Sequence, residues 1–195
     1  MRIALYGGSF NPPHLGHQLA CAVALASARP AIDEVWMVPT FQHAFGKPLA
    51  PFDDRYAMCE EAARVFAGRV RPSRIEEELG GPSYTLRTVR AIMERERDVE
   101  LVMVIGADLV AERPRWHAWE ELRELVSFLV IGRAGAGSVS AGTDGARDVQ
   151  VPIELPAVSS TEVRRRIACR EPTFGLLDER VRAHIERAAL YRATP

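Results

Sequence analysis

The chain has 195 residues, 47% hydrophobic and 26% charged, which suits one α/β domain with a full core and leaves little room for a second domain. Its formal net charge of -1 gives no general basic field for nucleic acid or an anionic membrane, so local groups must hold any anionic ligand. No apolar run approaches the roughly 20 residues that span a bilayer, and the N-terminus has the pattern of a strand and not of a signal peptide. We therefore expect a cytoplasmic protein.

Strand-like apolar runs alternate with amphipathic helical runs along the chain. We expect strands over residues 3–6, 35–38, 70–75, 101–105, 127–131 and 149–153, and helices over 17–27, 53–66, 84–95, 119–125, 161–169 and 178–189. The alternation predicts a Rossmann-like, doubly wound, mostly parallel sheet. We expect a single domain over residues 1–195, with a small helical part from about 156 to 195, and a surface loop over the Gly, Ser and Ala-rich residues 134–145.

Polar and glycine-rich segments follow several of these strands. They cover residues 7–17, 39–47, 106–108 and 159–164. Ligands of doubly wound sheets bind outside the carboxyl ends of the strands, where the strand order reverses. These segments are therefore the candidates for the functional site.

The first of them is Gly7-Gly8-Ser9-Phe10-Asn11-Pro12-Pro13-His14-Leu15-Gly16-His17. Two glycines after a buried strand let the backbone turn sharply and approach a ligand, and the following helix start favours an anion. His14 and His17 are three residues apart and can converge on one spot. The pattern indicates a phosphate site. A zinc site is the less favoured alternative, because no third ligand lies near in the sequence.

This segment resembles the HxGH motif of the nucleotidyltransferase superfamily, and the form GGSFNPPHxGH is similar to that of the bacterial nicotinate-mononucleotide adenylyltransferases. The resemblance extends over nearly the whole chain. It implies that an adenylyl group passes from ATP to a pyridine mononucleotide, with Mg²⁺ carried by the ATP phosphates and no protein metal cage. It implies ATP binding by Gly7, Gly8, Ser9, Phe10, His14 and His17, with both histidines also catalytic.

Two later segments extend the resemblance on the ATP side. Ser159-Ser160-Thr161-Glu162-Val163-Arg164 is similar to the family motif SSTxIR, in which Ser159, Ser160, Thr161 and a catalytic Arg164 would contact ATP. Ser-x-x-Glu is also a capping box, and a capped helix start is itself an anion site. Gly106-Ala107-Asp108 resembles the family's GAD segment, where Gly106 and Asp108 would contact the nucleotides, although a solvent-facing or capping Asp is the alternative.

Two further segments resemble the acceptor side. Ser83-Tyr84-Thr85 is similar to the family's SYT segment, in which Tyr84 and Thr85 would contact the acceptor, although the same residues can simply cap a helix. An aromatic residue in the family stacks on the pyridine ring, which implies this role for Trp116; core packing is the alternative. We expect Trp119 to be a core residue.

The resemblance breaks after the second strand, where the family commonly has PHK and this chain has His43-Ala44-Phe45-Gly46-Lys47. Lys47 is the only lysine among the 25 Lys and Arg residues. A compact ammonium at this one position suggests that it binds the acceptor phosphate, with a chance occurrence of the lysine as the alternative. Arg55 is a second candidate for that phosphate, with a surface salt bridge to Asp53 or Asp54 as the alternative. The role of His43 is left open.

The cysteines Cys21, Cys59 and Cys169 lie far apart with no CxxC spacing, which predicts buried thiols and neither a disulfide framework nor a zinc site. The acceptor is left open between nicotinate and nicotinamide mononucleotide. Another HxGH nucleotidyltransferase and an inactive nucleotide-binding regulator are more distant alternatives. The sequence does not determine whether the chain forms a homo-oligomer.

Overall fold

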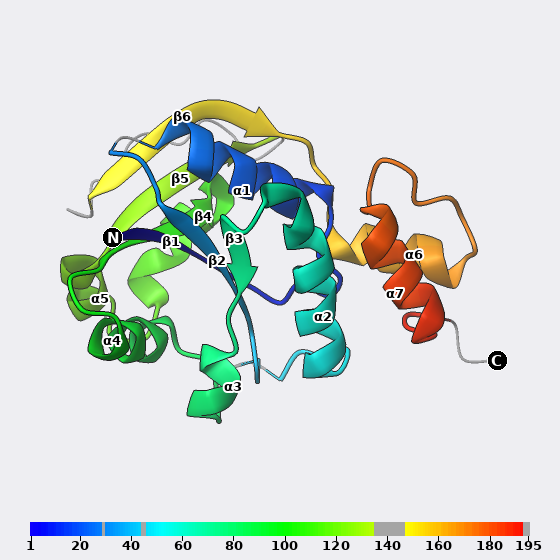
Figure 1. Ribbon diagram of the computed structural model, residues 1–195, viewed down its shortest axis with the longest axis horizontal. Helices are drawn as coiled ribbons and strands as arrows, with labels where there is room; N and C mark the ends of the chain where they lie inside the picture. Colours follow the sequence, from blue (N-terminus) through cyan, green and yellow to red (C-terminus); the bar gives the residue numbers. More distant parts are fainter. Residues whose placement is uncertain (29, 44–45, 135–146, 193–195) are drawn as a thin grey trace.

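A six-stranded parallel sheet forms the centre of the protein (Figure 1). The computed structural model describes residues 1–28, 30–43, 46–134 and 147–192. The strands are β1 (Arg2–Gly8), β2 (Glu34–Pro39), β3 (Val70–Pro72), β4 (Glu100–Gly106), β5 (Ser127–Arg133) and β6 (Asp148–Leu155), in the order β3-β2-β1-β4-β5-β6. Every neighbouring pair is parallel, and the order reverses between β1 and β4. This confirms the predicted doubly wound sheet.

Helices cover both faces of this sheet (Figure 1). They are α1 (Leu15–Ser27), α2 (Phe52–Ala63), α3 (Ile75–Leu79), α4 (Thr85–Arg95), α5 (Trp119–Leu125), α6 (Ser160–Ala168) and α7 (Glu179–Arg187), with two 3₁₀ segments, η1 (Arg64–Phe66) and η2 (Ala107–Arg115). Residues of α4 and α5 belong to one buried cluster and residues of α1 and α2 to another. The sheet therefore has two cores, one on each face.

The sequence of the central strands explains these two cores. In β4, Leu101 and Met103 belong to the cluster with α4 and α5, whereas Val102 belongs to the cluster with α1. Successive side chains of a strand point to opposite faces, so a strand covered on both sides is apolar at every position. In β1, likewise, Ile3 belongs to the cluster with α4 and α5, and Ala4 belongs to the cluster with α1 and α2.

Two expected elements differ from those observed. The expected strand over residues 70–75 ends at Pro72, and a short helix, α3, follows it. Its first turn holds Glu76, Glu77 and Glu78, which form helices well and suit the positive end of a helix dipole. The second helix begins at Phe52 with Pro51 as its N-cap, so Asp53 is not the cap as expected; it lies in the first turn.

The helical C-terminal part, expected from about residue 156, packs beside α2 and away from α4 and α5 (Figure 1). A third buried cluster joins Met58 of α2 to Val181 and Ile185 of α7. Cys21 and Cys59 are buried as expected, but the prediction for Cys169 is wrong, because it follows the last turn of α6 and is exposed.

The expected loop over residues 134–145 lies outside the described residues apart from Ala134. Within the described ranges, no helix is long and apolar enough to cross a membrane.

Candidate active site

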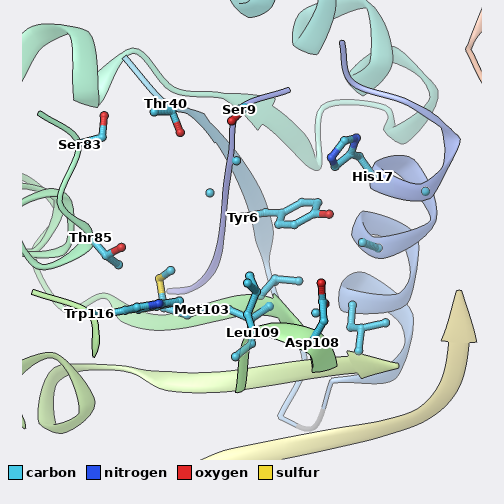
Figure 2. A pocket seen from close by; sticks show the side chains of 18 of the residues that line it. Tyr6, Ser9, His17, Thr40, Ser83, Thr85, Met103, Asp108, Leu109 and Trp116 are labelled. Carbon is cyan, nitrogen blue, oxygen red and sulfur yellow. The ribbon is translucent and has the colours of Figure 1, made fainter. Parts of the chain in front are cut away.

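A cavity of about 800 Å³ opens at the carboxyl ends of β1, β4 and β5, where the strand order reverses. His17 lies on one side of it, and Trp116, Ser83 and Thr85 lie on the other (Figure 2). Of the residues expected from the sequence, those that line it are Gly7, Gly8, Ser9, His14, His17, Tyr84, Thr85, Gly106, Asp108 and Trp116. Phe10, Lys47, Arg55 and the segment from Ser159 to Arg164 are not among its lining residues.

The segment that enters the first helix, residues 7–14, is called the phosphate loop after the phosphate site that its sequence predicts. Gly7 and Gly8 belong to β1 and pair with Val38 and Pro39, so the expected sharp turn does not occur at the glycines. It occurs at Phe10, which is buried and has a φ of 43°. A left-handed backbone at a bulky residue costs of order 1–3 kcal/mol and concentrates at functional sites. A Cβ at Gly8 would lie 3.3 Å from the Phe10 ring, so the glycine makes room for that ring.

His14 and His17 converge at the start of α1, as their spacing predicted. The backbone N–H of His14 donates to Nδ1 of His17 at 3.0 Å, and the two ring centroids are 3.8 Å apart. Because Nδ1 of His17 accepts this hydrogen bond, the neutral ring carries its proton on Nε2. Gly16 allows the close packing, since a Cβ there would lie 3.0 Å from Cε1 of His14. His17 therefore offers an N–H donor at the edge of the cavity.

Helix α6 begins behind the phosphate loop and donates to its carbonyl groups. Arg164 donates to the carbonyl of Asn11 at 2.7 Å, and the Ser160 hydroxyl donates to the carbonyl of Pro12 at 2.9 Å. The sequence segment from Ser159 to Arg164 is thus close to the phosphate loop and supports it, although none of its residues lines the cavity.

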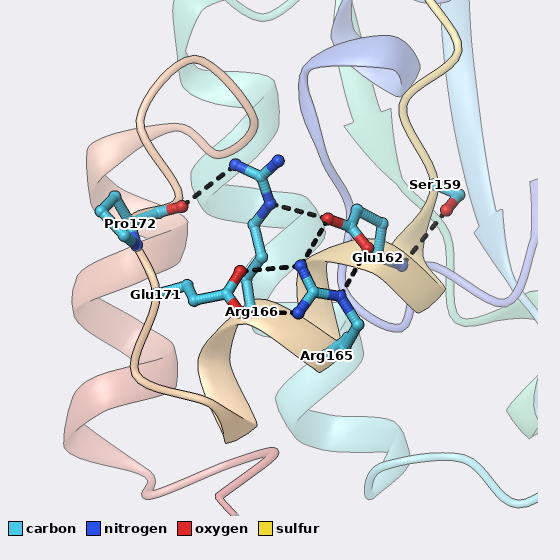
Figure 3. A network of polar contacts seen from close by, with 6 residues as sticks. All are labelled: Ser159, Glu162, Arg165, Arg166, Glu171 and Pro172. Atoms are coloured by element: carbon cyan, nitrogen blue, oxygen red, sulfur yellow. Dashed lines mark hydrogen bonds and ion pairs between the residues drawn. The ribbon is translucent and has the colours of Figure 1, made fainter.

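Only one of the two hydrogen bonds of the expected capping box is seen at the start of α6 (Figure 3). The Ser159 hydroxyl accepts a hydrogen bond from the Glu162 N–H at 3.2 Å. The Glu162 carboxylate, however, binds Arg165 and Arg166, and Arg165 also binds Glu171. These arginine contacts lower the pKa of Glu162 to about 2. The carboxylate is therefore engaged by the exposed arginines of the same helix.

Arg55 is buried, 1% exposed, so the alternative of a surface salt bridge is wrong. Its guanidinium donates to the carbonyl of Ser9 at 3.0 Å and to the carbonyl of Ala50 at 2.9 Å. Burial lowers the pKa of this guanidinium from its ordinary value. In the structure Arg55 thus joins the phosphate loop to the segment before α2 and does not face the cavity.

Asn11 connects the same two segments through its side chain. Its Oδ1 accepts hydrogen bonds from the Tyr191 hydroxyl at 2.8 Å and from the Ala50 N–H at 3.2 Å. Tyr191 follows α7, and burial raises its pKa. The phosphate loop is therefore fixed by groups from α2, α6 and the end of the chain.

The other side of the cavity is aromatic. Trp116 is half-buried and packs against Trp119 and Phe128, with ring centroids 6.3 Å and 6.5 Å away. Trp119 is 5% exposed and belongs to the core, as expected. Tyr84 lies 4.7 Å from His117, centroid to centroid. Trp116 packs on the core, as the alternative held, and it also lines the cavity, so its stacking on a pyridine ring stays a prediction.

Asp108 is the second residue of η2, which follows β4 directly, and its carboxylate lies close to Gly106. A Cβ at Gly106 would lie 2.3 Å from Oδ1 of Asp108, so only a glycine permits this position of the carboxylate. Lys47 is exposed and His43 is half-buried at the edge of the cavity.

The lining residues that the sequence did not predict include Thr40, Glu76 and Arg115. Glu76 lies in α3, a helix too short to give a periodic pattern. Within the described ranges, no group of three or more His, Cys, Asp or Glu side chains is placed to hold a metal ion. A metal ion that is carried by the phosphates of a ligand needs no such group.

The sequence pattern of the cytidylyltransferase-like family matches residues 5–166. A protein of Anaeromyxobacter dehalogenans (strain 2CP-1 / ATCC BAA-258), named probable nicotinate-nucleotide adenylyltransferase, is 41% identical over 193 residues, covering 97% of this chain and 96% of that protein. A protein of the same name from Myxococcus xanthus (strain DK1622) is 34% identical and covers 98% of this chain and 95% of its own length.

Solved structures share the fold. The Plasmodium falciparum nicotinic acid mononucleotide adenylyltransferase complexed with NaAD aligns with a TM-score of 0.83 at 19% identity, covering 97% of each chain. A structure described as that of a putative nicotinate-nucleotide adenylyltransferase from Vibrio parahaemolyticus aligns with a TM-score of 0.70 at 19% identity, covering 99% of this chain and 96% of that chain.

Proposed function

Because the chain belongs to the cytidylyltransferase-like family, and to its nicotinate-nucleotide adenylyltransferase group, we propose that it transfers the adenylyl group of ATP to nicotinate mononucleotide. The products are deamido-NAD and pyrophosphate. The observation that carries the proposal is the single cavity that runs from His17 and the phosphate loop to Trp116 and Thr85 (Figure 2). We assign the binding of an anion to one end of it and the stacking on a pyridine ring to the aromatic side chain at the other.

In this reaction a 5′-phosphate oxygen of the acceptor bonds to the α-phosphorus of ATP as the bond to pyrophosphate breaks. No covalent enzyme intermediate is needed, so catalysis depends on placing two anions in line and on stabilising charge at the α-phosphoryl group. We assign the donor on that group to Nε2–H of His17, with His14 and the loop backbone beside it. Mg²⁺ bound to the ATP phosphates would neutralise part of their charge.

We assign two roles to Arg164. It supports the phosphate loop through the carbonyl of Asn11, and the charge of its guanidinium also favours ATP phosphates nearby. Ser159, Ser160 and Thr161 act with it as the start of α6.

We propose that Trp116 stacks on the pyridine ring, that Tyr84 and Thr85 bind its carboxylate side, and that Asp108 accepts hydrogen bonds from ribose hydroxyls. Lys47, exposed on the segment before α2, would bind the acceptor phosphate. For Arg55 the burial of the side chain supports a positioning role in place of the expected phosphate contact.

A pyrophosphate-release assay across ATP and CTP, with nicotinate and nicotinamide mononucleotides as acceptors, tests this function. We expect release with ATP and nicotinate mononucleotide and little with CTP. Pyrophosphate release with nicotinamide mononucleotide alone would show that this mononucleotide is the acceptor. A protein that binds ATP but releases no pyrophosphate with either acceptor would be a nucleotide-binding regulator, and the enzyme assignment would be wrong.

A further inference from the structure

Glu76 differs from its two glutamate neighbours on α3. Glu77 forms an ion pair with Arg74 and Glu78 forms one with Arg95, both at the surface. Glu76 points inward and lines the cavity. Its Oε2 accepts a hydrogen bond from the Phe41 N–H at 3.1 Å, and its Oε1 accepts one from the Thr88 hydroxyl at 3.3 Å.

The Glu76 carboxylate thereby joins two segments of the cavity wall. Phe41 follows β2, between the lining residues Thr40 and His43, and its N–H also donates to the Ser83 hydroxyl at 3.1 Å. The Ser83 N–H donates to the carbonyl of Gln42 at 3.0 Å, next to a parallel bridge between Gln42 and Pro82. The segment after β2 and the segment before α4 are thus attached at Ser83, and Glu76 contacts both.

The groups that donate hydrogen bonds to the Glu76 carboxylate are neutral. Burial raises its pKa, while hydrogen bonds from Ser83, Phe41 and Thr88 and the charge of Arg55 act in the opposite direction. A carboxylate at this half-buried position, with neutral groups as its hydrogen-bond donors, costs free energy of folding. The position of a carboxyl group here therefore points to a role in the site.

We propose that Glu76 is a positioning residue for the acceptor half of the site. It holds the segment after β2, with Thr40 and His43, at a fixed distance from the segment of Ser83, Tyr84 and Thr85, which we assigned to the acceptor ring. This inference rests on the proposed function, because it takes the acceptor mononucleotide as the ligand between the two segments. ATP binds at the other end of the cavity and does not depend on this spacing.

The variant Glu76→Gln tests the proposal. The amide oxygen keeps the hydrogen bond from the Phe41 N–H, while the new NH₂ group has to donate to the Thr88 hydroxyl, so the charge-assisted hydrogen bonds between the carboxylate and these groups are lost without a change in side-chain size. We expect the KM for nicotinate mononucleotide to rise about tenfold, with the KM for ATP unchanged within about twofold, since a tenfold change corresponds to loss of one charged-group hydrogen bond. The matched control is Glu78→Gln on the same helix, which should change neither KM.

A second variant covers the case in which Glu76→Gln does not fold. Thr88→Val keeps the side-chain shape and removes the hydroxyl that donates to Glu76, and Thr88 is buried and does not line the cavity. It should raise the acceptor KM about threefold and leave the ATP KM unchanged. If both variants match the control in acceptor KM, the positioning role is wrong. If the wild type releases no pyrophosphate with any acceptor, the proposed function fails instead.

Discussion

Replacement of Arg55 by methionine separates the two roles considered for this arginine. Methionine keeps an unbranched, flexible side chain but has no donor, so the partly buried carbonyls of Ser9 and Ala50 lose partners at 3.0 Å and 2.9 Å. An unsatisfied buried group costs about 1–3 kcal/mol, and removal of a desolvated charge offsets part of this loss. We expect a net loss of about 2–4 kcal/mol in the free energy of unfolding.

Urea or thermal denaturation, with steady-state kinetics for both substrates, measures this effect. For a chain of this size the expected loss lowers Tm by roughly 4–16 °C. Arg55→Lys should lose less, because one ammonium keeps the charge but cannot bond both carbonyls as the guanidinium does. The control is Arg64→Met in η1, whose side chain is 62% exposed and paired with Glu61; it should change stability by no more than about 0.5 kcal/mol.

The kinetics distinguish positioning from phosphate binding. If Arg55 holds the loops, the variant loses stability, and its kcat falls with saturating substrates because the two phosphates are misplaced. If Arg55 instead binds the acceptor phosphate, Arg55→Met has the stability of the Arg64→Met control and a raised acceptor KM. That second result would refute the role inferred from burial.

His17→Ala should lower kcat by 10²–10³-fold, as expected for loss of one preorganised donor, with little change in ATP affinity by calorimetry; near wild-type turnover would exclude the assignment. Tyr191→Phe removes one hydroxyl from Oδ1 of Asn11 and should cost about 1 kcal/mol in urea unfolding, and an unchanged midpoint would show that this hydrogen bond adds nothing. Gly106→Ala should displace the Asp108 carboxylate and raise the KM of at least one nucleotide severalfold at constant Tm; unchanged KM values would remove Asp108 from the site.

The sheet was predictable because its signal is local. Each central strand is apolar at consecutive positions, and each is followed by an amphipathic run, which is enough to indicate parallel strands covered on both faces. The resemblance to the nucleotidyltransferases is confirmed by the family match and by the curated relatives. By contrast, α3 and η2 were missed, since a short helix and a 3₁₀ segment containing Pro114 give no periodic pattern.

The orientation of side chains around the phosphate loop was not predictable from local sequence. Arg55 follows two aspartates in an exposed-looking helix start, yet the packing of α7 on α2 buries that helix face. The left-handed residue is Phe10 and not one of the adjacent glycines, because the glycines continue the pairing of β1 with β2. Both outcomes depend on contacts between residues far apart in the chain.

Contacts of this kind also fix the positions of the two proposed halves of the site relative to each other. The segment that carries Lys47 is attached at its end to the phosphate loop, because Ala50 donates to Asn11 and accepts from Arg55. At its beginning, Phe41 is attached to the acceptor side through Glu76. An in-line transfer loses about 10²-fold in rate when a reacting group moves by roughly 1 Å. If the proposed roles hold, a segment attached at one end to each half of the site links the position of the acceptor phosphate to that of the α-phosphorus of ATP.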